Sequence, residues 1–255
     1  MFRWIAPLAA ALFLAGPALA ADEEVQVYMD EMSNPGQVGL DVHLNYVGDG
    51  THTFDYAGEQ DGRRRVRITP EWSYGLTRNL ELGLYLPLTT IDSSGHFLVG
   101  GAKARIKFIA PRSEGQGWFW GANLEVGRVR RALDINPWNA ELKGIYGFRS
   151  GPWTVAVNAN LDWTISGPQP GPATLEITTK VGYRLGNDVS AGIETYNGVG
   201  EVKRLGHFGQ SDQSTYAVID KGLGKWDLNF GVGHGYGASS DGWVVKAVVG
   251  VPIGG

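Results

Sequence analysis

Residues 66–86 read VRITPEWSYGLTRNLELGLYL, and this stretch decides the fold. Its first part alternates apolar and polar side chains from Val66 to Tyr74, and its second part has Leu at every second position from Leu80 to Leu86. An apolar period of two is typical of β-strands with one apolar face. The few residues between the two parts suffice only for a tight turn, so the stretch predicts a β-hairpin.

The same period recurs along the rest of the chain, where only 215–221 lacks a clear polar face. The segments that have it lie at 38–46, 65–74, 80–86, 102–108, 118–128, 140–148, 153–163, 174–185, 189–197, 215–221, 226–236 and 243–251. An all-β protein of about twelve strands is therefore predicted, with ten or fourteen as alternatives.

The connections between these segments alternate in length. Short ones lie at 75–79, 149–152, 186–188 and 222–225, with a somewhat longer one at 110–117, and long ones lie at 48–64, 88–98, 129–139, 164–173 and 198–214. Short periplasmic turns and longer outer loops are the plan of an outer-membrane barrel, whereas the loops of a soluble β-sandwich need not alternate. We expect residues 37–255 to form a closed antiparallel transmembrane β-barrel.

Aromatic residues of the apolar face fall into two bands at opposite strand ends. The first band would lie near the periplasmic end and contains Trp72, Tyr74, Phe108, Trp118, Trp120, Tyr146, Phe148, Trp153, Tyr183 and Trp226. The second contains Tyr46, Trp163, Tyr236 and Trp243. Amphipathic rings favour the level of lipid headgroups, so the bands indicate a wall that faces lipid.

The N-terminus predicts export. Arg3 precedes an apolar run, and Ala18-Leu19-Ala20 has the small-x-small pattern of a signal-peptide cleavage site. We expect residues 1–20 to be a signal peptide cleaved after Ala20, which sends the protein to the outer membrane. Residues 21–36 would then be a periplasmic segment or a plug.

Composition excludes several functions. Acidic residues outnumber basic ones, 26 to 22, and a nucleic-acid binder needs a basic field instead. The absence of cysteine excludes disulfides, a thiol nucleophile and a thiolate metal site. No H-E-x-x-H or comparable spacing occurs among the five histidines, and we expect His234 to belong to an aromatic band. We predict no catalytic residue, metal or cofactor.

The second face of the strands carries balanced charges that would line the lumen, because a charge at the lipid midplane costs about 2–4 kcal/mol. The main lumen-lining candidates are Arg67, Glu71, Glu81, Lys103, Arg105, Lys107, Glu125, Glu141, Lys143, Glu176, Lys180, Arg184 and Glu194. Asp41, Arg65, Asp162, Asp227 and Lys246 complete this face.

Estimated registers place opposite charges of this face together. Glu81 would meet Arg105, Glu125 would lie between Lys103 and Lys143, and Lys180 would meet Glu194. Such pairs either brace the wall or form an ion-selecting constriction, and balanced signs predict weak charge selectivity in both cases.

Arginines cluster where the second strand begins and the fifth ends, which is the outer rim in this topology. They are Arg63, Arg64, Arg65, Arg128, Arg130 and Arg131. Because guanidinium groups bind phosphate in bidentate fashion, contact with lipopolysaccharide phosphate is one hypothesis, and solvated rim charge is the alternative.

Four alternate glycines, Gly231, Gly233, Gly235 and Gly237, form an inner stripe without side chains. Such a stripe leaves space for a folded-in loop, the N-terminal segment or a passing solute, or it relieves crowding in a small barrel.

Residues 71–87, EWSYGLTRNLELGLYLP, and residues 100–107, GGAKARIK, resemble a family of outer-membrane proteins of the phenol meta-cleavage pathway that is often labelled simply "transporter". The resemblance is clear over about 66–108 and topological beyond. It implies a barrel that passes small molecules, hydrophobic or aromatic ones among them, and it brings no catalytic residues. The last residues, 251–255, read VPIGG in place of the aromatic end usual in such barrels, which leaves an internal strand as the source of the assembly signal.

We therefore expect a passive channel or transporter for small molecules. Its partners would be the lipid bilayer, lipopolysaccharide, the barrel-assembly machinery and a small solute. A closed structural or adhesive barrel is the first alternative, and an outer-membrane lipid hydrolase or acyltransferase is the second.

Overall fold

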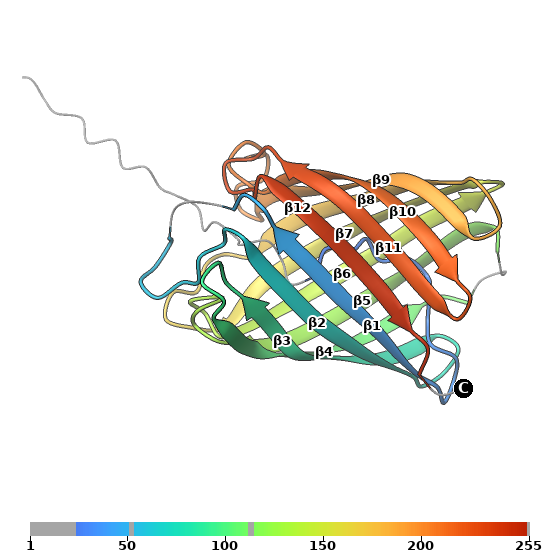
Figure 1. Cartoon of the computed structure of the whole chain (residues 1–255), viewed down its shortest axis with the longest axis horizontal. Helices are drawn as coiled ribbons and strands as arrows, with labels where there is room; N and C mark the ends of the chain where they lie inside the picture. Colours follow the sequence, from blue (N-terminus) through green and yellow to red (C-terminus); the bar gives the residue numbers. More distant parts are fainter. Residues whose placement is uncertain (1–23, 51–53, 112–114, 254–255) are drawn as a thin grey trace, which may run out of the picture.

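The computed structural model describes residues 24–50, 54–111 and 115–253, and the expected signal peptide lies outside them. Twelve antiparallel strands close into a barrel (Figure 1). They are β1 (Val38–Val47), β2 (Arg65–Gly75), β3 (Leu80–Ile91), β4 (Phe97–Ile109), β5 (Gly117–Val129), β6 (Trp138–Ser150), β7 (Trp153–Ser166), β8 (Thr174–Arg184), β9 (Val189–Glu201), β10 (Gln213–Leu223), β11 (Trp226–Gly235) and β12 (Trp243–Val251). The predicted fold class and strand number are confirmed.

The barrel closes between its first and last strands, which run side by side in Figure 1. β1 pairs with β12 from Leu40 opposite Val251 to Val47 opposite Val244. Each of the other strands pairs with its neighbours in sequence, so the described part of the sheet has no open edge. Closure satisfies the backbone groups that a bilayer could not hydrogen-bond.

The outer wall is apolar and carries the aromatic side chains of the two bands. Trp118 is 61% exposed, stacks on Tyr146 and packs against Phe148 with the rings tilted at one end. Trp243 is 56% exposed and packs edge-to-face on His234 at the other end. Leu, Val and Ile side chains are exposed between these ends. Continuous apolar exposure of this extent fits a lipid environment rather than water.

The described residues contain no helix that is long and apolar enough to cross a membrane.

The connection expected over 88–98 is shorter than the sequence pattern indicated. β3 continues to Ile91 and β4 begins at Phe97. Asp92 closes the turn, because its Oδ1 accepts hydrogen bonds from the backbone N–H groups of Ser94 (2.8 Å) and His96 (3.0 Å). The pairing of β3 with β4 shifts on both sides of Leu88, and such a bulge interrupts the alternation on which the prediction depended.

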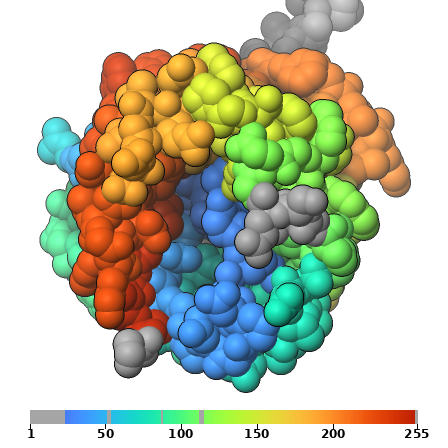
Figure 2. Space-filling view, turned by 90° about the vertical axis from the view of Figure 1, so that its right-hand side faces the viewer, coloured from blue at the N-terminus to red at the C-terminus, as the bar shows by residue number. Residues whose placement is uncertain are grey.

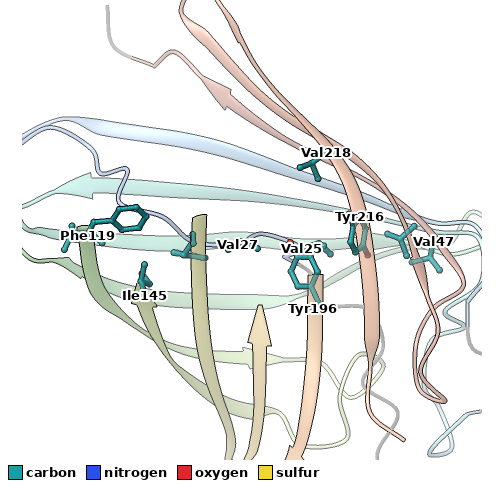
Figure 3. Close-up of a cluster of buried hydrophobic side chains, with 12 residues drawn as sticks. Val25, Val27, Val47, Phe119, Ile145, Tyr196, Tyr216 and Val218 are labelled. Carbon is teal, nitrogen blue, oxygen red and sulfur yellow. The ribbon is translucent and has the colours of Figure 1, made fainter. Parts of the chain in front are cut away.

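The described N-terminal residues, 24–36, lie inside the barrel, and we call them the luminal segment. Val25, Val27 and Tyr28 are at most 6% exposed and belong to the main buried hydrophobic cluster. Figure 3 shows Val25 beside Tyr196 and Tyr216 of the wall. Figure 2 looks into the end of the barrel and shows a hollowed mouth with blue N-terminal chain lying across it.

Candidate channel lumen

The first two residues of the luminal segment, Glu24 and Val25, contact the wall. Oε2 of Glu24 accepts a hydrogen bond of 3.1 Å from the Tyr85 hydroxyl on β3. The backbone oxygen of Val25 accepts a hydrogen bond of 2.9 Å from Nζ of Lys246 on β12. Lys246 is fully buried. A charged donor therefore holds the backbone of the segment.

Tyr28 is the central anchor of the segment. Its side chain is 3% exposed, and its hydroxyl contacts both the Tyr85 hydroxyl and Oε1 of Glu125, the latter at 3.3 Å. Nζ of Lys143 lies 4.1 Å from the centre of its ring, and Nζ of Lys107 lies 5.0 Å from it. Cations over the ring face add electrostatic attraction to the apolar burial.

Residues 30 and 31 of the segment are acidic and contact basic side chains of the wall. Asp30 is 2% exposed and pairs with Arg149 on β6, which also contacts the Glu31 carboxylate at 3.0 Å. Nζ of Lys107 donates to the backbone oxygen of Glu31 at 2.7 Å. Two residues further along the chain, the Ser33 hydroxyl forms a hydrogen bond of 2.8 Å with the Ser73 hydroxyl. The segment is thus bound to several strands around the barrel.

One charge network of the wall joins β2, β3 and β4. Nη2 of Arg105 contacts Oε1 of Glu81 at 2.8 Å, so the expected contact is present, although the register places Glu81 opposite Lys107 rather than Arg105. Arg105 also bonds to Glu71. Glu71 in turn contacts Nε2 of His43 at 3.0 Å. Arg105 stands directly opposite Gly83, where an added Cβ would collide with its side chain. Glycine at that position lets the guanidinium cross to both carboxylates.

A second network lies on the opposite part of the wall. Glu194 stands directly opposite Lys180, and Nζ of Lys180 contacts its Oε1 at 3.2 Å, as the register predicted. Nζ of Lys180 also contacts Oδ1 of Asp220 at 2.8 Å. Lys246 reaches Glu194 across the interior, and the Tyr196 hydroxyl donates to Oε2 of Glu194 at 2.9 Å.

The register expected around Glu125 differs from the structure. Glu125 stands opposite Arg105 on one side and Glu141 on the other, and Lys143 stands opposite Asn123. Each predicted register took the middle of the connecting segment as the centre of the hairpin. The two flanking strands end at unequal distances from that centre, so the observed pairing is displaced by two residues. Lys143 instead contacts Glu141 at 3.2 Å.

The remaining lumen candidates occupy different depths. Arg67 is 4% exposed inside the barrel, and Lys103 and Glu176 are partly buried. Nδ2 of Asn160 donates to Glu176 at 2.9 Å. Arg184 is exposed at the short-turn end, where it donates to the backbone oxygen of Gly151 at 3.2 Å.

The outer arginines divide into two groups. Arg63, Arg64, Arg128, Arg130 and Arg131 are exposed. Arg65 begins β2 at the same end of the barrel but is 1% exposed on the inner face, so its side chain is not available to a phosphate outside the barrel. Arg63 hydrogen-bonds the Asp61 carboxylate and lowers the pKa of that carboxyl to about 2.

The glycine stripe of β11 makes room for parts of the barrel itself. An added Cβ at Gly233 would collide with the Tyr216 ring, and one at Gly231 would lie 2.9 Å from Val218. At Gly235 it would collide with Asp241, and at Gly237 with Ser211. Of the alternatives considered, relief of crowding fits the contacts of Gly231 and Gly233 with the neighbouring strand, and a folded-in loop fits those of Gly235 and Gly237, because Asp241 and Ser211 lie between strands.

Sequence reasoning missed the interior side chains that bind the segment without charge. Tyr85, Tyr196, Tyr216 and Asn158 are at most 6% exposed, and all of them face the lumen. For Tyr85, Tyr196 and Asn158 the available signal was parity, because each stands on the otherwise polar face of its strand. Tyr216 had no such signal, because residues 215–221 lack a clear polar face.

Comparison with known proteins places this arrangement among outer-membrane barrels. No protein-family model and no curated protein matches the chain. Three similar solved structures are the "COG4313 outer membrane channel from Pseudomonas putida F1", a KdgM porin in complex with disordered oligogalacturonate, and a NanC porin.

Their coverage and identity support a likeness of fold. For the Pseudomonas putida channel the TM-score is 0.60, with 15% identity over 89% of this chain and 99% of that one. The KdgM porin has a TM-score of 0.57 and 8% identity, covering 85% and 99%. The NanC porin has 0.54 and 10%, covering 84% and 100%. The chain has the fold of outer-membrane β-barrels, and the narrower phenol meta-cleavage assignment stays a prediction.

Proposed function

We propose that the protein is a passive outer-membrane channel for small molecules, opened when the luminal segment leaves the barrel. The observation that carries this proposal is an interior lined with ion pairs around a short terminal segment. A wall built only to be stable could be filled with apolar side chains, whereas charged faces suit a water-filled passage. The similar solved structures are channels and porins by name, which adds support.

The chemistry of the segment indicates the class of solute. Residues 24–36 contain Glu24, Asp30 and Glu31 and no Lys or Arg. Arg149, which contacts Asp30 and Glu31, and Lys107, which donates to the Glu31 backbone, would face a solute after the segment has left. We therefore propose small anions, aromatic carboxylates among them, because Tyr and Phe side chains also line this space. One of the similar solved structures is a KdgM porin in complex with disordered oligogalacturonate.

Single-channel recording in planar bilayers tests the proposal. We compare the mature chain with a variant that lacks residues 24–32 and keeps 33–36, because Gly36 donates a 2.7 Å backbone hydrogen bond to Gly75. The expected result is low or intermittent current for the mature chain and steady, larger current for the variant. Benzoate flux into liposomes should exceed that of an uncharged solute of similar size.

Absence of current and flux in both proteins would contradict the channel. A closed structural or adhesive barrel would then be the better assignment, and phospholipid turnover in the same liposomes would favour an enzyme. Both proteins must be shown to be folded. Each should therefore migrate differently on a gel when its sample is boiled than when it is left unboiled.

Cleavage after Ala20, assembly by the barrel-assembly machinery and contact of the outer arginines with lipopolysaccharide remain part of this proposal. The contact is tested by neutralising the five exposed arginines Arg63, Arg64, Arg128, Arg130 and Arg131 together. Lipopolysaccharide that co-purifies unchanged with this variant would remove the phosphate-binding role.

A further inference from the structure

Three metal-ligating side chains meet where the luminal segment passes the first two strands. Glu24 belongs to the segment, His43 to β1 and Glu71 to β2, and each offers one ligand atom within 4.8 Å of the other two. His43 is 1% exposed and Glu71 is 3% exposed. The cluster therefore lies inside the barrel, where surface acids do not explain its grouping.

Two polar atoms of this cluster lack a hydrogen-bond partner. They are Oε1 of Glu24 and Nδ1 of His43, and both are buried. Buried polar atoms are usually satisfied, because an unpaired donor or acceptor loses its hydration without compensation. A cation bound by the cluster would supply a partner for this carboxylate oxygen.

We propose that Glu24, His43 and Glu71 bind one divalent transition-metal ion, best represented by Zn²⁺, which fastens the luminal segment to the wall. One imidazole with two carboxylates suits zinc, whereas carboxylates alone would favour magnesium or calcium. The ion would join residues that lie far apart in sequence.

The surrounding groups are arranged to support such a site. The Tyr85 hydroxyl donates to Oε2 of Glu24, which leaves Oε1 for the ion. Arg105 bonds to both Glu71 and Glu81, so Glu71 can turn an oxygen towards a metal while Arg105 keeps a carboxylate partner. Hydrogen bonds of this kind orient ligands in known metal sites.

Because Glu24 is supplied by the segment, metal binding and docking of the segment are coupled. An ion that binds only the docked state at a hundred times its Kd shifts the docking equilibrium about a hundredfold. The proposal thus adds a ligand that holds the barrel closed, and its binding test does not depend on conduction.

Calorimetric titration of the mature, untagged and chelator-treated protein with Zn²⁺ is the first test. We expect one ion per barrel, and at least tenfold weaker binding in both H43A and E24Q. Two histidines serve as matched controls. His234 packs on Trp243 at the outer surface and His96 lies in an exposed turn beside Asp92, so H234A and H96A should bind Zn²⁺ as the parent does.

Labelling of a single cysteine is the second test, because the chain has no cysteine of its own. In Q26C, Zn²⁺ should slow maleimide modification at least tenfold, and E24Q in the same background should remove this protection. Glu24 lies outside the strands, so E24Q leaves the barrel wall intact even where H43A fails to fold.

The outcomes separate the parts of the proposal. Absence of Zn²⁺ binding by the parent protein overturns the site, and so does equal Zn²⁺ binding by the parent, H43A and E24Q. Loss of binding in H43A with full binding in E24Q overturns the link to the segment. Either result can coexist with a conducting channel, so failure here is distinguishable from failure of the proposed function.

Discussion

The side-chain amide of Asn158 bonds both backbone polar groups of Tyr28. Its Oδ1 accepts from the Tyr28 N–H at 2.7 Å, and its Nδ2 donates to the Tyr28 oxygen at 2.9 Å. Asn158 is fully buried on β7. One side chain thus imitates the edge of a β-strand and satisfies a backbone that runs through the lumen without a neighbouring strand.

Replacement of Asn158 should loosen the segment. N158A removes both hydrogen bonds and leaves two buried backbone groups unpaired, which costs about 1–3 kcal/mol of docking free energy. We expect Q26C to react with maleimide roughly 5- to 150-fold faster in this background. The control is N160A, because Asn160 bonds to Glu176 and belongs to the same strand. Equal rates in N158A and the parent would show that the clamp does not hold the segment.

Arg149 should contribute to docking through charge. R149Q leaves Asp30 buried without its cation, and a buried charge that loses its partner is strongly destabilising. We expect longer open periods in single-channel records, or faster Q26C labelling. R184Q is the matched control at the same end of the barrel. D30N combined with R149Q should recover part of the loss, and full additivity of the two changes would contradict a direct pair.

Docking should weaken above pH 10. Burial, reinforced by Glu24, raises the pKa of the Tyr28 phenol well above its ordinary value. The docked phenol stays protonated, while the phenol of a released segment ionises near pH 10. The released state therefore binds fewer protons, and rising pH favours it over the docked state.

Ionisation of the Tyr28 phenol should favour release of the segment about tenfold more at pH 11 than at pH 9. Labelling of Q26C as a function of pH, corrected for thiolate content, measures the change. Y28F removes the phenol and serves as the comparison, because lysine titration affects both proteins alike. An identical pH dependence in Y28F would exclude Tyr28 as its source.

The strands were predictable because two solvents act on opposite faces of one sheet. Val66 to Tyr74 and Leu80 to Leu86 alternate since every second side chain must tolerate lipid. Registers were less predictable, because they depend on where each strand ends. The pair of Lys180 with Glu194 was placed correctly across a turn of few residues, whereas Glu125 was displaced by two.

The interior could be predicted only in part. Parity places Glu71, Arg105 and Lys246 on the inner face, but it carries no information on which of them meet across the lumen. The path of residues 24–36 depends on single contacts with distant strands, such as that of Asn158. In sequence, Asn158 is one polar residue among many on an alternating strand, so its role emerges only when the barrel is closed.

Glu194 should matter more for barrel stability than either of its lysine partners. It is 1% exposed and binds both Lys180 and Lys246. E194Q leaves Lys246, which is fully buried, without a carboxylate partner, and breaking one side of a buried pair costs about 3–5 kcal/mol. K246M should cost less, because Glu194 keeps Lys180 and the Tyr196 hydroxyl, and methionine fills a similar volume. Urea unfolding in detergent micelles, followed by tryptophan fluorescence, measures both variants. A larger loss in K246M than in E194Q would mean that the lysine stabilises the wall mainly through its bond to the Val25 backbone, and removal of residues 24–32 should then erase the difference.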